Sequence, residues 1–462
     1  MSAIDAFHLP GIDDDDIQEW QELGAPGLSV RAPLLAPEGL QRVLRRLRAA
    51  QLRLRRIPVR RIISAIDEVA ARLLDPADSL RHIVETALPL LTGYSPAMVR
   101  LGLDRMAGDW RTAALERVLH AELGGPAPLD GIVARHGRRI IALPYPLVTH
   151  VFAGNVPGVA VTSLVRALLV RSASLGKTAA GEPLLPALFA RALADVDAEV
   201  GAAIAVCYWP GGHDPLERIA LAETDALVVY GGAAALADIR RRTPAQVPVI
   251  DHGPRLSVGF VARNAADDDD DARALAAAAA SGIATFDQQG CVSPHAIYIE
   301  HDALDAAAFA DLLARELADV QRTLPRGELT ADEAAAIRRL RTRAEFGSTD
   351  ADGMRLISAP DDPFTILLHT HAGFEPSCLQ RTVHVYPVTD IESALAALTP
   401  YRHLLQSAAV AGGDDDLRLR IAQSGFTRIT SFDRMPWPDP AGHHDGHGPL
   451  LELLRTVSVE DS

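Results

Sequence analysis

Residues 151–170 read VFAGNVPGVAVTSLVRALLV and contain the clearest helical pattern in the chain. Its first half contains two glycines and a proline, which is typical of a turn. Its second half carries apolar side chains three and four residues apart, the spacing of one face of an α-helix. The apolar positions are Val161, Leu164, Val165, Leu168 and Leu169. The sequence therefore predicts a helix over 159–170 that follows directly on a turn.

Outward from this stretch, β-like and helical runs alternate along the chain. The first β-like runs are 139–143, 202–207, 226–230, 247–250 and 256–262. A second block has helical runs at 303–323, 331–344 and 391–398 and β-like runs at 363–368 and 381–388. This alternation predicts an α/β fold with two doubly wound, mostly parallel sheets. In such sheets ligands bind at the carboxyl ends of the strands.

We expect four segments along the chain. Residues 1–37 form an irregular surface arm, and residues 38–252 combine N-terminal helices, broken at Pro58, with the first α/β domain. Residues 253–432 form the second α/β domain, and residues 433–462 form a C-terminal segment. The acidic runs 267–271 and 414–416 are expected at helix starts or in loops, because carboxylates are favourable near a helix N-terminus.

Composition excludes several classes of protein. The chain has 462 residues, with 45 Lys and Arg against 60 Asp and Glu, so its formal net charge is −15. This acidity argues against a nucleic-acid partner. No apolar run is long enough to predict a membrane span, and the N-terminus lacks the pattern of a signal peptide. Three cysteines without a CxxC pair exclude a disulfide framework and a zinc ribbon, so we expect a cytoplasmic protein.

The helical stretch 38–74 carries most of the N-terminal basic charge. One interpretation is a site for an acidic partner or for the phosphate groups of a ligand. The other, which we favour, is a solvated helix face that pairs with the protein's own carboxylates. The arginines are Arg42, Arg45, Arg46, Arg48, Arg53, Arg55, Arg56, Arg60 and Arg61.

The most informative segment for chemistry is IATFDQQGCVSPH, residues 283–295. It puts Cys291 after a polar turn and before an apolar run. A lone cysteine is more often a small buried residue, but the polar neighbours Asp287, Gln288 and Gln289 are not typical of an apolar core. Cys291 is therefore the candidate nucleophile, whereas Cys207 is expected to pack in the core.

Two further polar residues stand between β-like and helical runs. Asn155 either satisfies local backbone groups or donates to a developing oxyanion. Lys177, at the end of a short strand, suits a ribose or phosphate, although a surface lysine is the default. Neither a G-x-G-x-x-G turn nor a P-loop occurs in the chain, so a nucleotide would need another cradle.

Six short sequence motifs, called words below, resemble those of the acyl-CoA reductases of the LuxC type. These reductases belong to the aldehyde dehydrogenase superfamily. The resemblance extends over about residues 38–458. It implies an aldehyde dehydrogenase-like fold, with a cofactor domain, a catalytic domain and an N-terminal helical extension. The words are FAGNVPG (152–158), GKTAAGEP (176–183), DALVVYGG (225–232), FDQQGCVSPH (286–295), RTVHVYPV (381–388) and HHDGHGPLLELLR (443–455).

The resemblance also implies roles for individual residues. Cys291 would be the nucleophile, and Asn155 with the Cys291 backbone N–H would form the oxyanion hole. Lys177 would hold the adenosine ribose of a nicotinamide cofactor, and the glycines at 231 and 232 would border its pyrophosphate. The cofactor-binding set is Phe152, Gly154, Lys177, Thr178, Gly231 and Gly232.

The chain differs from superfamily members at two positions, and these differences indicate the cofactor and the reaction. Ala180 stands where NAD-selective relatives carry a glutamate that holds the ribose 2′-hydroxyl, so we expect NADPH, with NADH as an alternative. Residues 251–254, DHGP, lack the glutamate that activates water in aldehyde-oxidising members. We expect NADPH-dependent reduction of a fatty acyl thioester to the aldehyde. The alternatives are an aldehyde dehydrogenase that forms acids and a non-catalytic subunit of a reductase complex.

Partners and metals complete the expectations. The acyl donor would be acyl-CoA or an acyl carrier, with an acyl-transferring synthetase or carrier protein as a possible partner and a homo-oligomer as the assembly. The word HHDGH (443–447) invites a metal site, but adjacent histidines lack the spaced H-x-x-x-H pair of zinc enzymes. We expect no metal and a structural or substrate-channel role for this word.

Overall fold

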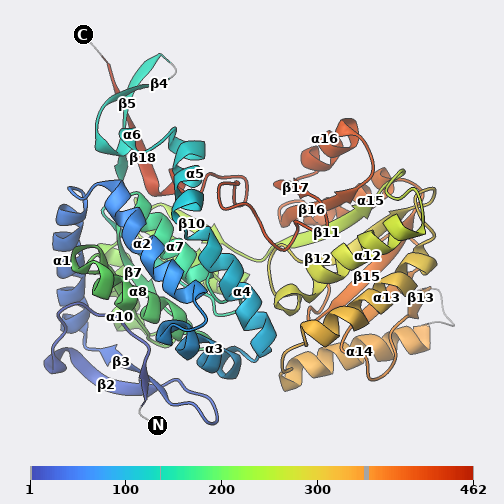
Figure 1. Ribbon diagram of the computed structural model, residues 1–462, viewed down its shortest axis with the longest axis horizontal. Coiled ribbons are helices and arrows are strands. Elements are labelled where there is room, and N and C mark those ends of the chain that lie inside the picture. The colour runs from blue at the N-terminus through green and yellow to red at the C-terminus, as the bar shows by residue number, and fades with distance from the viewer. Residues whose placement is uncertain (1–2, 136, 348–352, 461–462) are drawn as a thin grey trace. The chain divides into compact units, whose positions relative to one another are not determined.

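The computed structural model describes residues 3–135, 137–347 and 353–460. The chain divides into two compact units (Figure 1). Unit 1 comprises Met1–Thr92, Val99–Gly253 and Asp439–Ser462, and unit 2 comprises Gly93–Met98 and Pro254–Pro438. The expected four-segment division stays a prediction, and residues 1–2 and 461–462 of its terminal segments lie outside the described residues.

Unit 1 is built on a five-stranded sheet with the order β10-β9-β6-β7-β8, in which every pair is parallel. Most of its side chains are buried, which explains why the strands read as continuous apolar runs. This sheet confirms the predicted doubly wound α/β fold. Its strands are β6 Leu147–Val151, β7 Ala173–Lys177, β8 Ile204–Cys207, β9 Ala226–Tyr230 and β10 Val249–His252.

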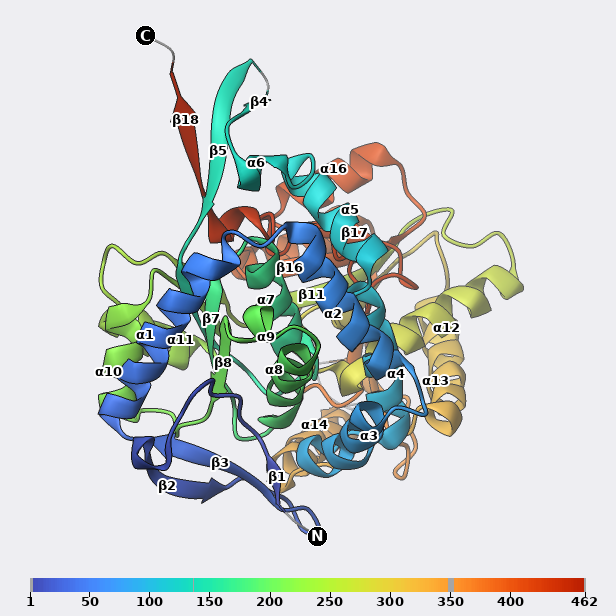
Figure 2. The same ribbon diagram turned by 60° about the vertical axis from the view of Figure 1, so that its left-hand side comes forward.

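Helices cover both faces of this sheet (Figure 2). Helices α1 (Pro37–Leu54) and α10 (Asp214–Glu223) pack on one face, and α7 (Val159–Leu169) and α8 (Leu184–Val196) pack on the other, with α2 (Val59–Leu74) outside them. Helix α7 and the break at Pro58 are as predicted. The remaining helices of this part of the chain are α3 Ser79–Thr92, α4 Pro96–Asp109, α5 Thr112–Leu123, α6 Ala127–Asp130, α9 Ala198–Gly201 and α11 Ala233–Arg242.

The prediction of an irregular arm over the first 37 residues is wrong. Strands β1 (Ile4–Asp5), β2 (Ile17–Glu22) and β3 (Val30–Leu35) form a three-stranded sheet, and the short 3-10 helix η1 (Asp14–Asp16) precedes β2. Strand β3 is almost wholly buried, but Pro33 and Arg31 obscure its pattern, and β2 (IQEWQE) has no apolar alternation. Pairing between the strands, rather than local pattern, makes this sheet.

The β-like run 139–143 is also a correction, because it does not join the parallel sheet. It lies in β5 (Arg138–Pro144), which pairs antiparallel with β4 (Val133–Arg135) and with β18 (Leu454–Val459). The partner β18 comes from the far end of the chain. A local pattern identifies a strand but carries no information about such a distant partner.

Unit 2 contains a seven-stranded sheet with the order β13-β14-β15-β12-β11-β16-β17, in which only β13 is antiparallel. Helices α12 (Asp269–Ala284) and α13 (Ala306–Thr323) bury one face, and α15 (Ile391–Leu398) and α16 (Asp415–Gln423) bury the other. Helix α14 (Ala331–Gly347) packs beside β13 and β14. The strands are β11 Leu256–Val261, β12 Pro294–Glu300, β13 Met354–Leu356, β14 Thr365–His369, β15 Thr382–Val388, β16 Leu405–Ala411 and β17 Arg428–Thr430.

The two acidic runs of this unit start helices, as predicted. The Asp268 side chain accepts from two backbone N–H groups of α12, and the Asp414 side chain accepts from the Leu417 N–H of α16. Both are N-caps, which satisfy orphan donors at the helix start. Across the described parts of the chain, no helix combines the length and the apolar character that crossing a membrane would require.

Candidate active site

Cys291 lies in unit 2, in the short loop between the 3-10 helix η2 (Thr285–Gln288) and strand β12. Its side chain is exposed, and its carbonyl oxygen accepts from Ser257 Oγ at 2.8 Å. Cys207 is buried, as predicted, and burial raises the pKa of its thiol to about 12. Burial also raises the pKa of Cys378. Of the three cysteines, all of which lie in the described residues, Cys291 is the exposed one.

Two left-handed turns hold the segment ahead of Cys291. Residues 286–288 have φ of 49°, 47° and 67°, and residues 379–381 have φ of 65°, 55° and 61°. Non-glycine residues rarely adopt this conformation, and each costs of the order of 1–3 kcal/mol unless its surroundings enforce it. The Gln380 N–H donates to the Asp287 carbonyl at 3.0 Å, so the two turns face each other.

A buried ion pair and a buried amide enforce these turns. Arg381 Nε donates to Asp287 Oδ1 at 2.7 Å, and both side chains are almost fully buried. Gln288 donates to the Pro294 and Thr382 carbonyls at 2.7 Å each and accepts from the Thr382 N–H at 2.8 Å. These bonds tie the nucleophile loop to strands β12 and β15, which fixes the position of Cys291 within unit 2.

Arg428 supplies positive charge near the thiol. Burial lowers the pKa of its guanidinium, and the electrostatic influence of Cys291 opposes that shift. The guanidinium is held by the Met435 carbonyl at 2.9 Å and the Arg434 carbonyl at 2.7 Å. These bonds hold Arg428 in a fixed position within unit 2.

The other predicted site residues lie in unit 1, at the carboxyl ends of three neighbouring strands. Val151 pairs with Lys177 on one side and with Val229 on the other, so β6, β7 and β9 end in the same row of the sheet. This edge is where doubly wound sheets bind ligands. The residues that reach or follow it are Phe152, Gly154, Asn155, Lys177, Thr178, Gly231 and Gly232.

Phe152 and Lys177 shape this edge. The Phe152 ring lies over Gly176 so closely that a Cβ there would be 2.8 Å from the ring, and it stacks with His150 at 5.6 Å between ring centroids. Burial lowers the pKa of Lys177, while Glu217 and Cys207 oppose the shift. Thr178 uses its N–H and hydroxyl internally, since both donate to the Cys207 carbonyl at 2.9 and 3.2 Å.

Asn155 is exposed in the loop that leads into α7. The loop ends at Gly158, whose φ of 97° favours glycine. A Cβ at Gly158 would also overlap Met106 Sδ. Gly158 therefore fixes the turn between Asn155 and α7.

Glu182 was not singled out by the sequence, yet it organises the loop after Lys177. Its carboxylate accepts from the Leu184 and Leu185 N–H groups at 3.0 and 2.7 Å, which caps α8. Burial raises the pKa of Glu182 to about 7. Ala180 is exposed in the same loop. The signal that could have identified this cap is a glutamate directly before the proline and the apolar run of α8.

The residues of the C-terminal word 443–447 lie in two different environments. His444 and Asp445 lie against His252, the last residue of β10, with Asp445 Oδ2 at 3.3 Å from the Nδ1 atom of each histidine. His443 and His447 are exposed. Burial lowers the pKa of His252. Sequence reasoning missed His252, because nothing local connects it with residues 193 positions away.

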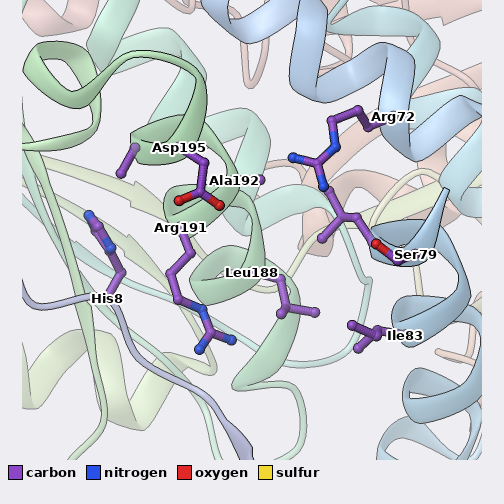
Figure 3. Close-up of a pocket in the computed structure, with 10 residues that line it drawn as sticks. His8, Arg72, Ser79, Ile83, Leu188, Arg191, Ala192 and Asp195 are labelled. Atoms are coloured by element: carbon purple, nitrogen blue, oxygen red, sulfur yellow. The ribbon is translucent and has the colours of Figure 1, made fainter.

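A separate cavity of about 390 Å³ in unit 1 contains none of the predicted site residues (Figure 3). Three of its polar side chains are engaged elsewhere in unit 1. Arg191 donates to the Asp5 carbonyl at 2.6 Å, Arg72 donates to Asp78 at 3.1 Å, and His8 bonds the Gly201 carbonyl at 3.1 Å. We assign no ligand to this cavity.

The two α/β units, one with a parallel sheet and one with a mostly parallel sheet, have the fold of aldehyde dehydrogenases. Among solved structures, a salicylaldehyde dehydrogenase from Pseudomonas putida G7 matches with a TM-score of 0.77 at 14% identity, over 100% of this chain and 99% of that one. The NADP-dependent glyceraldehyde-3-phosphate dehydrogenase from Bacillus halodurans C-125, complexed with NADP, matches with a TM-score of 0.71 at 17% identity, over 96% and 95%. These likenesses confirm the predicted fold.

The family follows from the sequence comparisons. The family model described as acyl-CoA reductase (LuxC) matches residues 54–456. The chain belongs to the acyl-CoA reductase (LuxC) family. It is 25% identical over 456 residues to the long-chain acyl-protein thioester reductase of Photobacterium phosphoreum. The aligned region covers 97% of this chain and 89% of that protein. The resemblance and the enzyme class expected from the six words are confirmed.

Proposed function

We propose that this protein reduces a fatty acyl thioester to the aldehyde with NADPH, through a thioacyl intermediate on Cys291. The observation that carries the proposal is the exposed Cys291 on a loop fixed by the buried Asp287–Arg381 pair. Membership of the acyl-CoA reductase family and the name of the Photobacterium relative support an acyl thioester as substrate.

The chemistry assigned to the chain begins at Cys291. Its thiolate attacks the thioester carbonyl carbon, and the carbon–sulfur bond to the donor breaks. The departing thiolate of CoA or of a carrier takes up a proton. In this proposal, Asn155 and the Cys291 N–H donate to the oxyanion. When the bound carbonyl has been reduced, the thiohemiacetal collapses to release the aldehyde and return the Cys291 thiolate.

A nicotinamide cofactor fits the strand ends of unit 1. The half-buried Lys177 offers a cation, and Gly231 and the exposed Gly232 at the end of β9 offer backbone without side chains to a dinucleotide. Such a cofactor supplies a hydride when bound. The NADP complex of the Bacillus halodurans structure, which shares the fold, supports the assignment.

NADPH is the preferred form in this proposal because the loop after Lys177 offers no carboxylate to a ribose. Ala180 is exposed, and the nearby Glu182 side chain is buried and occupied by two backbone N–H groups of α8. A 2′-phosphate therefore meets no repelling charge from these two positions.

Reduction rather than hydrolysis fits the residues at the end of β10. The Asp251 carboxylate pairs with Arg240 at 2.8 Å, and His252 is held against Asp445. Neither is the solvent-facing glutamate that would activate water against the thioester. The thioacyl group on Cys291 is then left for the reductant.

The experiment is a panel of acyl-CoA and acyl-carrier substrates of varied chain length, with NADPH and NADH, in which cofactor oxidation is followed and aldehydes are trapped. We expect NADPH oxidation to match aldehyde formation, and Cys291→Ala to abolish both. Cys378→Ser is the matched control and should retain activity. Faster formation of acid from aldehyde and NAD⁺ than of aldehyde from thioester would overturn the proposal.

A further inference from the structure

We propose that His252, His444 and Asp445 form a binding site for a divalent transition metal of the zinc class. The three side chains come from two distant parts of unit 1, the end of β10 and the C-terminal segment. One ligand atom from each lies within 4.8 Å of the other two. The inference is independent of the proposed reaction.

The C-terminal ligands are presented by a tight turn. His444 and His447 exchange two backbone hydrogen bonds of 2.9 Å each, and the residues between them, Asp445 and Gly446, have φ of 52° and 86°. Two positive φ values in a row are typical of a type I′ turn. This turn lets the adjacent His444 and Asp445 side chains converge, which a regular strand would prevent by alternating them.

The distances, which are long for charge-assisted hydrogen bonds, are also compatible with a shared ion. Asp445 Oδ2 is 3.3 Å from His252 Nδ1 and 3.3 Å from His444 Nδ1. Charge-assisted N–H···O bonds are about 2.7–2.9 Å long. Metal–ligand bonds of about 2.0–2.1 Å at tetrahedral angles separate neighbouring ligand atoms by about 3.3 Å.

The surroundings hold the ligands in place. Side-chain exposure is 8% for Asp445, 11% for His252 and 27% for His444. The His252 ring stacks on Tyr230 at 4.5 Å and meets the edge of His444 at 4.5 Å. Packing of this kind fixes ring orientation, which metal affinity requires.

The donor set selects the class of ion. Two imidazoles and one carboxylate suit zinc and its neighbours rather than calcium or magnesium, which prefer oxygen ligands. Three protein ligands leave a fourth position for water or for an oxygen of a bound ligand. The expectation of no metal rested on the spacing within residues 443–447, which does not include His252.

The test measures metal binding by the tag-free full chain after treatment with a chelator. We expect one zinc ion per chain by titration against a chromophoric chelator, and visible absorption of tetrahedral type when Co²⁺ is added instead. His444→Ala should weaken zinc binding more than about 100-fold, since loss of even an outer partner costs about 10–100-fold. Asp445→Asn, which tolerates the positive φ, should also weaken binding.

The matched control is His443→Ala, which removes an exposed histidine one residue away. It should bind zinc as the wild type does, and circular dichroism should show that all variants are folded without metal. The inference is overturned if the wild type binds no more zinc than His444→Ala, or if His443→Ala loses binding equally. Because these readouts need no turnover, failure of the reductase proposal would leave them unchanged.

Discussion

At the residue scale, environment separates three chemically identical cysteines. Cys207 is buried and its thiol pKa is raised to about 12, while Cys291 is exposed, with Arg428 within electrostatic range. A thiol must be accessible to attack a carbonyl, so exposure makes Cys291 the candidate nucleophile among the three. The polar neighbours of Cys291 indicated from the sequence that it does not pack in the core, whereas Arg428, 137 positions further along the chain, could not be connected with it.

Glu182 makes stability depend on pH. Its folded pKa of about 7 lies above the ordinary 4.5, so between these values the folded state keeps a proton that the unfolded chain releases. The free energy of unfolding therefore falls as pH rises through this window, by up to about 3 kcal/mol. Glu182→Gln keeps an acceptor for the α8 N–H groups, so we expect a flatter profile and higher stability than the wild type above about pH 7.

Denaturant unfolding at about pH 5 and about pH 8 measures this effect. The control is Glu116→Gln on the exposed face of α5, which should leave the profile of the wild type intact. An unchanged pH dependence in Glu182→Gln would show that the Glu182 carboxyl does not titrate in this window.

Ala180 provides a test of cofactor preference. Ala180→Glu adds a carboxylate that repels a 2′-phosphate, so we expect the KM for NADPH to rise at least about 10-fold, or about 1.4 kcal/mol, relative to NADH. Ala180→Gln, similar in size but uncharged, is the control for crowding. Equal effects of Glu and Gln on the ratio of NADPH to NADH would contradict the electrostatic explanation.

At the element scale, the loop that carries Cys291 depends on two facing left-handed turns. The words FDQQGCVSPH and RTVHVYPV meet there, since Asp287 belongs to the first and Arg381 to the second. Asp287 and Arg381 are 94 residues apart, which explains why the sequence alone did not predict that the two words are in contact. Helices such as α7 were predictable because their signal is local.

Breaking the Asp287–Arg381 pair should destabilise unit 2. Asp287→Asn leaves the buried guanidinium without its counter-charge, so we expect a loss of about 3–5 kcal/mol in the free energy of unfolding. Denaturant unfolding measures it, and the exposed pair Asp319–Arg322 provides the control, because Asp319→Asn should change stability by less than about 1 kcal/mol. Similar effects at both positions would contradict the account.

Gly158 tests the turn between Asn155 and α7. Gly158→Ala should lower stability by about 1–3 kcal/mol because φ is 97°, and further because the new Cβ overlaps Met106 Sδ. In a double-mutant cycle with Met106→Ala, the combined loss should be smaller than the sum of the single losses. Strict additivity would show that contact with Met106 plays no part.

The sequence did not predict the strands, or the strand partners, that depend on pairing between segments. The strand at 139–143 was recognised, but its partner β18 lies near the C-terminus, and the N-terminal strands β1–β3 have no clean alternation. The same limit applies to the site. Cys291, Asn155 and Lys177 stand in local words, whereas His252 with Asp445 is a contact made only by the fold.

At the scale of the whole molecule, the net charge of −15 is distributed unevenly. Four of the arginines in α1 and α2 pair with the protein's own carboxylates: Arg42 with Asp16, Arg48 with Asp225, Arg61 with Asp197, and Arg72 with Asp78. The favoured interpretation of a self-paired helix face is supported at these positions. Arg45, Arg46 and Arg53 are exposed, and Arg46 donates to the Pro10 carbonyl at 3.4 Å.

Charge reversal on α1 tests carrier docking. Replacing Arg45, Arg46 and Arg53 by glutamate should raise the KM for an acidic acyl-carrier substrate by about 10-fold and leave the KM for acyl-CoA nearly unchanged. The difference should shrink at high salt. Equal effects on both substrates, or none, would count against docking through this helix.

The most direct test of the central claim is the intact mass of the protein after mixing with acyl-CoA in the absence of cofactor. We predict a mass increase of one acyl group, mapped to Cys291 by peptide analysis, absent in Cys291→Ala, and discharged as aldehyde when NADPH is added. Aldehyde formation by Cys291→Ala, or an acyl group on another residue that NADPH discharges, would contradict the account.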